Sequence, residues 1–69
     1  MQTGIIKIDG IQSRQDADKV LNALHGVWGV LDAKVNLNNH EAAFRYDEKA
    51  ASEQDFEAAI TEIGFGIRS

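Results

Sequence analysis

Residues 13–24 read SRQDADKVLNAL and residues 52–63 read SEQDFEAAITEI, so that the two segments align without a gap. In each segment apolar residues recur at i, i+3, i+4 and i+7, the spacing of one face of an amphipathic helix. The residues of the two stripes are Ala17, Val20, Leu21 and Leu24, and Phe56, Ala59, Ile60 and Ile63. The repeat predicts one helix that begins at Arg14 and stops at Gly26, and a second from about Glu53 to Ile63.

Segments of alternating or isoleucine-rich sequence surround the two helices and predict strands. The predicted strands are Thr3–Ile8, Val30–Leu37, Glu41–Tyr46 and a short edge strand over Phe65–Arg68. The side chains expected to face the core are Ile6, Ile8, Ala33, Val35, Leu37, Ala42, Phe44 and Tyr46. Between the second and third strands, Asn38 and Asn39 are expected to take left-handed backbone and make a hairpin turn.

The resulting order, βαββαβ, predicts an α+β, ferredoxin-like sandwich in which two helices cover one face of a four-stranded antiparallel sheet. A chain of 69 residues is long enough for one core, so a single domain over residues 1–69 is expected. In this topology the segments 9–16, 37–40 and Gly64-Phe65 meet at one end of the sheet. A ligand site is expected at that end, and His25, at the other end of the first helix, is excluded from it.

Composition excludes several classes of function. The net charge of −4 and the pI near 4.9 argue against nucleic acid or an anionic membrane as partner. No apolar run approaches the roughly 20 residues that cross a bilayer. The chain has no cysteine, so a disulfide or a thiolate site is impossible, and a cytoplasmic location is expected. Met1 directly before a strand is the start expected of a free-standing product.

A loop glycine, two helix residues and three further segments occur in the order and spacing of a known family. They are Gly10, Val20, Leu24, VWGVLDAKVNL (27–37), EAAFRYD (41–47) and EIGFGI (62–67). Through them the chain resembles the heavy-metal-associated domains, which include copper chaperones, periplasmic mercury-binding proteins and the amino-terminal modules of metal-pumping ATPases. The resemblance covers roughly Gly4 to Ile67 and implies the same βαββαβ fold.

The metal-binding motif of that family is missing. Where the family has Gly-Met-Thr-Cys-x-x-Cys, this chain has Ile11 for methionine, Gln12 for threonine, and Ser13 and Asp16 for the two cysteines. Because Cu(I) and Hg(II) are soft ions that favour thiolates, binding of the family type is not expected, and no cofactor is expected.

The spacing Ser13-x-x-Asp16 is also that of a helix capping box. In such a box the Ser13 hydroxyl accepts the amide of residue 16, and the Asp16 carboxylate accepts the amide of Ser13. The second helix begins in the same way, with Ser52 and Asp55, where no metal site is expected. The repeat therefore favours helix capping as the role of Ser13 and Asp16.

No catalytic set is predicted. The segment DGIQSRQD (9–16) has one glycine and cannot form a glycine-rich phosphate cradle, and Ser13 and Asp16 lie at the opposite end of the helix from His25. The sequence instead predicts a non-catalytic domain that keeps the fold, has lost the soft-metal site and acts by protein–protein contact or regulation in metal homeostasis. The expected partner is a protein, such as a metal transporter or a related domain.

Two alternatives stay open on the sequence. Asp9, Asp16 and His40 could together bind a divalent ion weakly through oxygen and nitrogen. A scaffold whose cysteines were removed deliberately would also have this sequence.

Candidate contact residues come from the loop end and from the segment that follows the first helix. They are Ile11, Gln12, Arg14, Trp28 and Phe65. Trp28 is expected to close the bottom of the core between the helix ends and the sheet, with partner contact as the alternative, since tryptophan is enriched at binding hot spots. Phe65 is expected to shield Ile11 and the loop from water.

Overall fold

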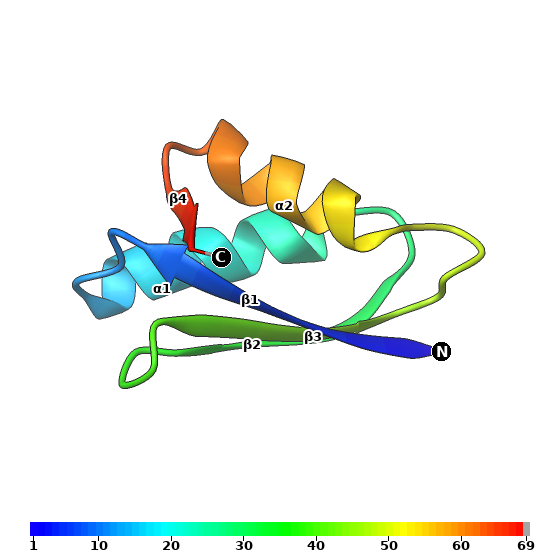
Figure 1. Cartoon of the computed structure of the whole chain (residues 1–69), viewed down its shortest axis with the longest axis horizontal. Helices are drawn as coiled ribbons and strands as arrows, with labels where there is room; N and C mark the ends of the chain where they lie inside the picture. Colours follow the sequence, from blue (N-terminus) through cyan, green and yellow to red (C-terminus); the bar gives the residue numbers. More distant parts are fainter. Residues whose placement is uncertain (69) are drawn as a thin grey trace.

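The computed structural model describes residues 1–68 and confirms the predicted order of elements (Figure 1). The elements are β1 (Gln2–Asp9), α1 (Arg14–His25), β2 (Val30–Asn36), β3 (Glu41–Tyr46), α2 (Glu53–Glu62) and β4 (Gly66–Arg68). Both helices lie on the same face of the sheet, so the fold is the α+β ferredoxin-like sandwich that the repeat predicted. None of the helices in residues 1–68 has the length and apolar character needed to cross a bilayer.

The four strands are antiparallel and lie in the order β2-β3-β1-β4. β1 therefore lies inside the sheet, with β3 on one side from Gln2↔Tyr46 to Lys7↔Glu41, and with β4 on the other. β2 and β4 form the two edges. The amide of Ile8 donates to the carbonyl of His40 at 2.8 Å, which continues the pairing into the hairpin turn and ties that turn to the end of β1.

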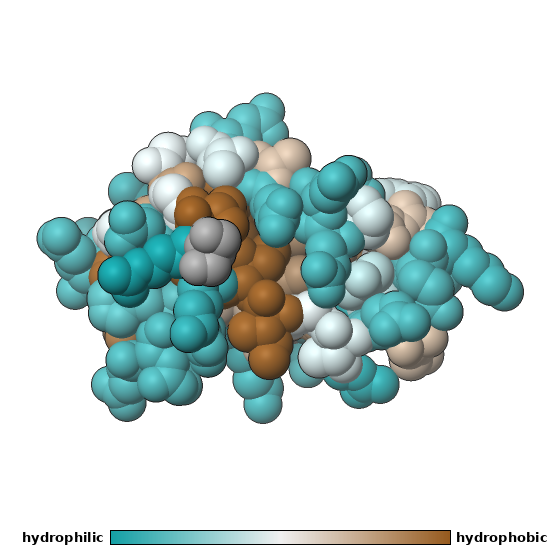
Figure 2. All heavy atoms as spheres, viewed as in Figure 1, coloured by the Kyte–Doolittle hydropathy of each residue, from teal (hydrophilic) through white to brown (hydrophobic). Residues whose placement is uncertain are grey.

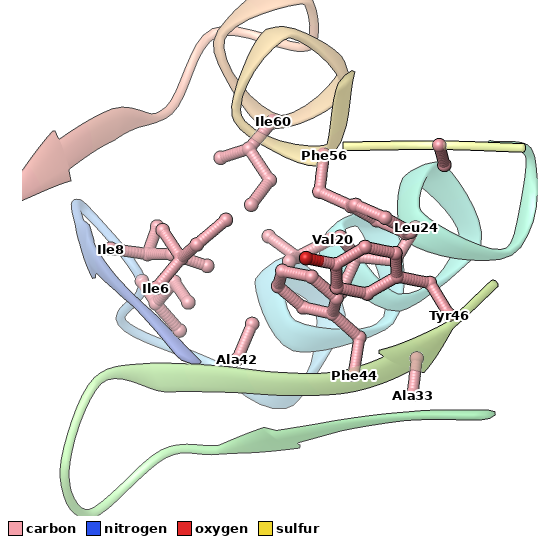
Figure 3. Packing of buried hydrophobic residues seen from close by; sticks show 12 residues of the cluster. Ile6, Ile8, Val20, Leu24, Ala33, Ala42, Phe44, Tyr46, Phe56 and Ile60 are labelled. Carbon is pink, nitrogen blue, oxygen red and sulfur yellow. The ribbon is translucent and has the colours of Figure 1, made fainter. Parts of the chain in front are cut away.

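The core fills the space between the sheet and the two helices (Figure 3). Its largest fully buried side chains come from both layers and are Phe44, Phe56, Ile8, Ile11, Leu24, Ile60 and Val20. The rings of Phe44 and Phe56 stack with centroids 4.1 Å apart, and the ring of Tyr46 lies 5.2 Å from that of Phe56. Among residues 1–68 no polar or charged residue is buried, so the core is held by apolar packing. Hydrophilic residues cover much of the face shown in Figure 2, around one hydrophobic patch.

Three local predictions differ from the structure. Leu37 is 39% exposed because β2 ends at Asn36 and leaves Leu37 in the turn. Ile63 is 42% exposed because it caps the end of α2 after the last helical residue. The last strand begins at Gly66, one residue later than expected.

The hairpin turn also differs in detail from the prediction. The residue with left-handed backbone is His40, with φ 55°, and neither Asn38 nor Asn39 has a positive φ. The side-chain oxygen of Asn36 accepts the amides of Asn38 at 2.9 Å and of Asn39 at 3.3 Å. This side-chain turn satisfies the two amides, so the reversal of the chain falls on the next residue.

Candidate functional site

The ends of β1, the hairpin turn and β4 meet at one end of the sheet, as the topology predicted. They surround a shallow pocket of about 420 Å³ that is lined by residues 9–12, His40, Gly66 and Arg68. Gly10 reverses the chain there with φ 99°, a backbone region in which a side chain is strained. This end is where the resemblance places the metal loop of the family.

Phe65 lies beside this loop. A Cβ atom placed on Gly10 would be 3.6 Å from Cδ1 of Phe65. Phe65 is half-buried and packs against the core cluster that contains Ile11. Ile11 is 1% exposed, so this residue anchors the loop to the core and is removed from the candidate contact residues.

Ser13 and Asp16 are both engaged in starting α1. Ser13 has the extended backbone of a capping residue, with φ −144° and ψ 169°, and its Oγ accepts the amide of Asp16 at 3.3 Å. Oδ2 of Asp16 accepts the amide of Gln12 at 3.1 Å. The predicted acceptor role of the serine is therefore confirmed, whereas the carboxylate takes the amide one residue earlier than expected. The reason is the path of the loop: because Ile11 is buried, the amide of the next residue, Gln12, faces the first helical turn.

The start of α2 gives a direct comparison. Oδ2 of Asp55 accepts the amide of Ser52 at 2.9 Å and the hydroxyl of Ser52 at 3.4 Å. In both helices an Asp carboxylate thus satisfies an amide that has no intrahelical acceptor and lies near the positive end of the helix dipole. The shared chemistry shows that these side chains suffice to explain how each helix begins.

The predicted oxygen and nitrogen ligand set is not assembled. The carboxylate of Asp16 is turned to the Gln12 amide, and Oδ1 of Asp9 lies 3.9 Å from Nε of Arg68. His40 lines the pocket with Asp9, but Asp16 does not. Within the part of the chain that the structure describes, no three His, Asp or Glu side chains gather in a way that could hold a metal ion. The expectation that Asp9, Asp16 and His40 together form a site for a divalent ion is therefore not met in this structure.

Trp28 does not close the bottom of the core. Its side chain is 85% exposed, and the neighbouring Val27 is the residue that packs against the core. The backbone is held here by Gly29, which has φ 98°, accepts the amide of Asp47 at 2.9 Å and lies against Ala50. Because Val27 faces in and Gly29 is pressed against the next loop, the residue between them turns outward.

The candidate contact residues consequently fall into two regions. Gln12, Arg14 and Phe65 lie at the loop end, and Gln12 and Arg14 are exposed. Trp28 follows the carboxyl end of α1, and a helix of 12 residues is about 18 Å long. The two regions are at opposite ends of the molecule (Figure 1), so one small partner surface does not touch both.

Two residues near these regions were not singled out from the sequence. Arg68 reaches the loop pocket because β4 pairs Lys7↔Arg68, which brings it next to Asp9. Leu31 is 50% exposed and lies in a β-bulge of β2, where the register shifts between Val30 and Asp32. In the sequence, the sign of this bulge is that Val30 and Leu31 are successive apolar residues, which interrupts the alternation expected of a strand.

The resolved pKa shifts lie away from the loop end. Burial, followed by the nearby carboxylates of Glu53 and Glu48, raises the pKa of Tyr46. A backbone hydrogen bond, followed by the N-terminal ammonium, lowers the pKa of Glu48. Met1 carries that ammonium at the opposite end of β1 from the loop, where its nitrogen lies 3.0 Å from Oε2 of Glu48.

The family described as "Heavy-metal-associated domain" matches residues 5–66. The chain belongs to this family. This heavy-metal-associated domain is 27% identical over 67 residues to the copper chaperone CopZ of Staphylococcus aureus, across 97% of this chain and 98% of the relative.

Solved structures agree with this assignment. The domain is similar to a CopZ metallochaperone, with TM-score 0.94 and 25% identity over 97% of this chain and 100% of the other. It is also similar to a copper binding domain from a P-type ATPase, with TM-score 0.92 and 27% identity over 100% of this chain and 96% of that one. The relatives are thus metallochaperones and a copper binding domain. This heavy-metal-associated domain has no cysteine and so has no Cys-x-x-Cys motif.

Proposed function

We propose that this heavy-metal-associated domain is non-catalytic, does not carry a soft metal ion, and acts by protein–protein contact or regulation in metal homeostasis. The observation that carries the proposal is the hydrogen bonding of Ser13 and Asp16. Their side-chain oxygens accept the amides of Asp16 and Gln12 at the start of α1. In the resemblance these are the two positions that present sulfur to a metal.

The chemistry of the remaining donors supports the loss of the soft-metal site. Cu(I) and Hg(II) favour thiolate or thioether sulfur over a neutral hydroxyl or a single carboxylate. The one sulfur atom of the chain belongs to Met1, whose Sδ accepts from Arg45 at 3.6 Å at the other end of β1. A sulfur at that place cannot complete a site at the loop.

Trp28 is the proposed anchor of the protein contact. It is 85% exposed, whereas Phe44, Tyr46 and Phe56 are all buried. Tryptophan supplies a large rigid contact area and is enriched at the centres of interfaces. Because the relatives include a copper chaperone and a domain of a P-type ATPase, the proposed partner is a metal transporter or a related domain, in the cytoplasm.

A competition titration tests the loss of the soft-metal site. The wild-type domain, the Ser13→Cys single variant and the Ser13→Cys/Asp16→Cys double variant are titrated with Cu(I) against a chromophoric chelator. The double variant is expected to remove Cu(I) from the chelator, because it places two thiols at a helix N-terminus that favours thiolate. The wild-type domain and the single variant are expected to leave the chelator saturated.

A wild-type domain that withdraws Cu(I) from the chelator would contradict the proposal. Zn(II), Ni(II) and Co(II) are added separately to the wild-type domain while the amide spectrum is followed by NMR. Saturable amide shifts confined to residues 9–16 and 40 would show that the loop end binds a divalent ion through oxygen and nitrogen, and would contradict the proposal.

A second experiment tests the anchor. Trp28→Ala and Ile5→Ala are compared for binding to isolated soluble domains of metal transporters from the same source. Ile5 is the matched control because it is 62% exposed and lies on the outer face of the sheet. Trp28→Ala is expected to weaken binding about 30-fold, the effect of losing about 2 kcal/mol at a hot spot, and Ile5→Ala to leave it unchanged. Equal affinity of Trp28→Ala and the wild-type domain would refute Trp28 as the anchor.

A further inference from the structure

β2 is an open edge of the sheet. It lies at the end of the order β2-β3-β1-β4 and is seven residues long, whereas β4, at the other edge, has three residues. An edge strand presents backbone N–H and C=O groups that can pair with another strand. β2 is therefore the longer of the two edges available for such pairing.

The hydrogen bond between Ile8 and His40 shows which residues of β2 direct their backbone outward. Because the Ile8 amide donates to the His40 carbonyl, even-numbered residues of β3 direct their backbone groups toward β1 and odd-numbered ones toward β2. The register Lys34↔Ala43 then makes Lys34 bond β3 and leaves Ala33 and Val35 facing the open edge.

The Ala33 amide supports this assignment. It donates to Oδ1 of Asp32 at 2.9 Å, so its nearest acceptor is the side chain of the preceding residue on the same edge strand. In the isolated chain the carboxylate therefore occupies an edge amide that a neighbouring strand would use.

We propose that β2 pairs antiparallel with β2 of a second copy, with Ala33 opposite Ala33, to form a two-fold dimer with one continuous sheet. In this register Asp32 of each copy lies opposite Lys34 of the other, on the outer face of the sheet. Both residues are exposed. They occupy the non-hydrogen-bonded positions of the pair, where opposing side chains are closest.

The charges select this register over its neighbours. A two-fold pairing centred on Asp32 opposes two carboxylates, and one centred on Lys34 opposes two ammonium groups, both of which are unfavourable. A shift of the register by one residue would place the side chains of the outer face of one copy on the same side as the inner-face side chains of the other. Among these arrangements only the one centred on Ala33 places opposite charges together, twice for each dimer.

The surface beside the edge suits a second copy as well. A groove of about 710 Å³ is lined by residues of α1 and β2 and also by Ile5 of β1 and Glu41 and Ala43 of β3. Its apolar side chains from α1, β2 and the turn after β2 are Ala17, Leu21, Val35 and Leu37. A second copy placed against β2 would cover part of this groove. The loop end that contains residues 9–16 of each copy would lie at opposite ends of the dimer, because the strands run antiparallel.

Sedimentation equilibrium over a concentration series tests the dimer. The average mass of the wild-type domain is expected to rise from one chain toward two between about 10 μM and about 1 mM, the range of a small interface. Lys34→Asp opposes carboxylates at both symmetric positions and is expected to weaken dimerisation at least about tenfold. Lys49→Asp, the same change of charge in an exposed loop, is the control and is expected to behave as wild type.

The charge swap Asp32→Lys/Lys34→Asp keeps the wild-type net charge and restores opposite charges in the same register. It is expected to recover dimerisation that Lys34→Asp loses. A second readout needs no variant: the amides of Ala33 and Val35 should exchange with solvent more slowly as the wild-type concentration rises.

A wild-type domain that stays monomeric at about 1 mM would overturn the proposal. So would a Lys34→Asp variant that dimerises as wild type, or a folded swap variant that stays monomeric. Circular dichroism establishes that each variant is folded. These outcomes leave the proposals on metal binding and on Trp28 unaffected, since those are read out by Cu(I) competition and by transporter binding.

Discussion

Replacing Ser13 with alanine removes the hydroxyl that accepts the Asp16 amide, and replacing Asp16 with alanine removes the carboxylate that accepts the Gln12 amide. Loss of a serine cap costs about 1 kcal/mol. Loss of an exposed carboxylate at the first helical turn costs about 0.5–1 kcal/mol through its hydrogen bond and the helix dipole. The two losses add up to about 1.5–2 kcal/mol for the double variant. Because Ser13 contacts Asp16 in one capping network, a departure from this sum measures the coupling between the two residues.

This loss is measurable in so small a domain. At about 0.05–0.15 kcal/mol per residue, the whole domain has a free energy of unfolding of about 3–10 kcal/mol. Each kcal/mol shifts Tm by about 4–8 °C for a domain of this length, so the double variant should melt about 6–16 °C lower. Far-UV circular dichroism is the assay: thermal unfolding gives the change in Tm, and urea unfolding gives the change in free energy. Trp28 is 85% exposed, which makes its fluorescence a weak reporter of unfolding.

The start of α2 supplies the matched control. The Ser52 hydroxyl bonds the Asp55 carboxylate, and that carboxylate accepts the Ser52 amide, so Asp55→Ala should cost more than Ser52→Ala. If Ser13→Ala and Asp16→Ala each changed the unfolding free energy by less than about 0.3 kcal/mol while Asp55→Ala was costly, the capping argument for the loop would be wrong. Ser13 and Asp16 would then be free for another role.

Three further predictions concern the packing and the charges of the fold. Gly4→Ala should destabilise the domain by about 1–3 kcal/mol in urea unfolding, because the added Cβ would lie 2.5 Å from the Phe44 ring. Gly29→Ala should lower the free energy of unfolding by a similar amount, about 1–3 kcal/mol, since Gly29 has φ 98° and the added Cβ would lie 2.8 Å from Cβ of Ala50. Wild-type stability of either variant would contradict the packing described for that glycine. Glu48 should titrate by NMR below its ordinary pKa, and acetylation of the N-terminus should move that pKa upward. Because the folded-state pKa of Glu48 is lowered, its contribution to stability is present above the unfolded-state pKa and is lost as the pH falls through the folded-state pKa. An unchanged pKa of Glu48 after acetylation would exclude the ammonium as a cause of the shift.

Much of the candidate site could be predicted because its parts are local. Ser13 and Asp16 are three residues apart, and any helix that begins between them brings the hydroxyl and the carboxylate to its first amides. The identity of the amide was less predictable. Asp16 takes that of Gln12, because the path of the loop depends on the burial of Ile11, which is a tertiary contact.

Trp28 shows the limit of such reasoning. An aromatic residue next to a helix end is often buried, and nothing in the local pattern says which of Val27 and Trp28 faces the core. The outcome depends on the approach of Gly29 to Ala50, two residues far apart in the chain. The ligand set of Asp9, Asp16 and His40 fails in part for the same reason. Asp9 lies beside Arg68 of the distant strand β4, whereas the carboxylate of Asp16 is held locally by the Gln12 amide.

Local sequence information was enough to predict the order of helices and strands, the inward face of β3, the helix starts and the absence of sulfur from the loop. These follow from periodicity, from hydrogen bonds within one turn and from composition, all of which act over a few residues. The folded arrangement was needed to establish that Ile11 is buried, that Trp28 is exposed, and that β2 is left as an open edge. Each of these depends on which distant segments touch, and that is set by how the sheet and both helices share one small core.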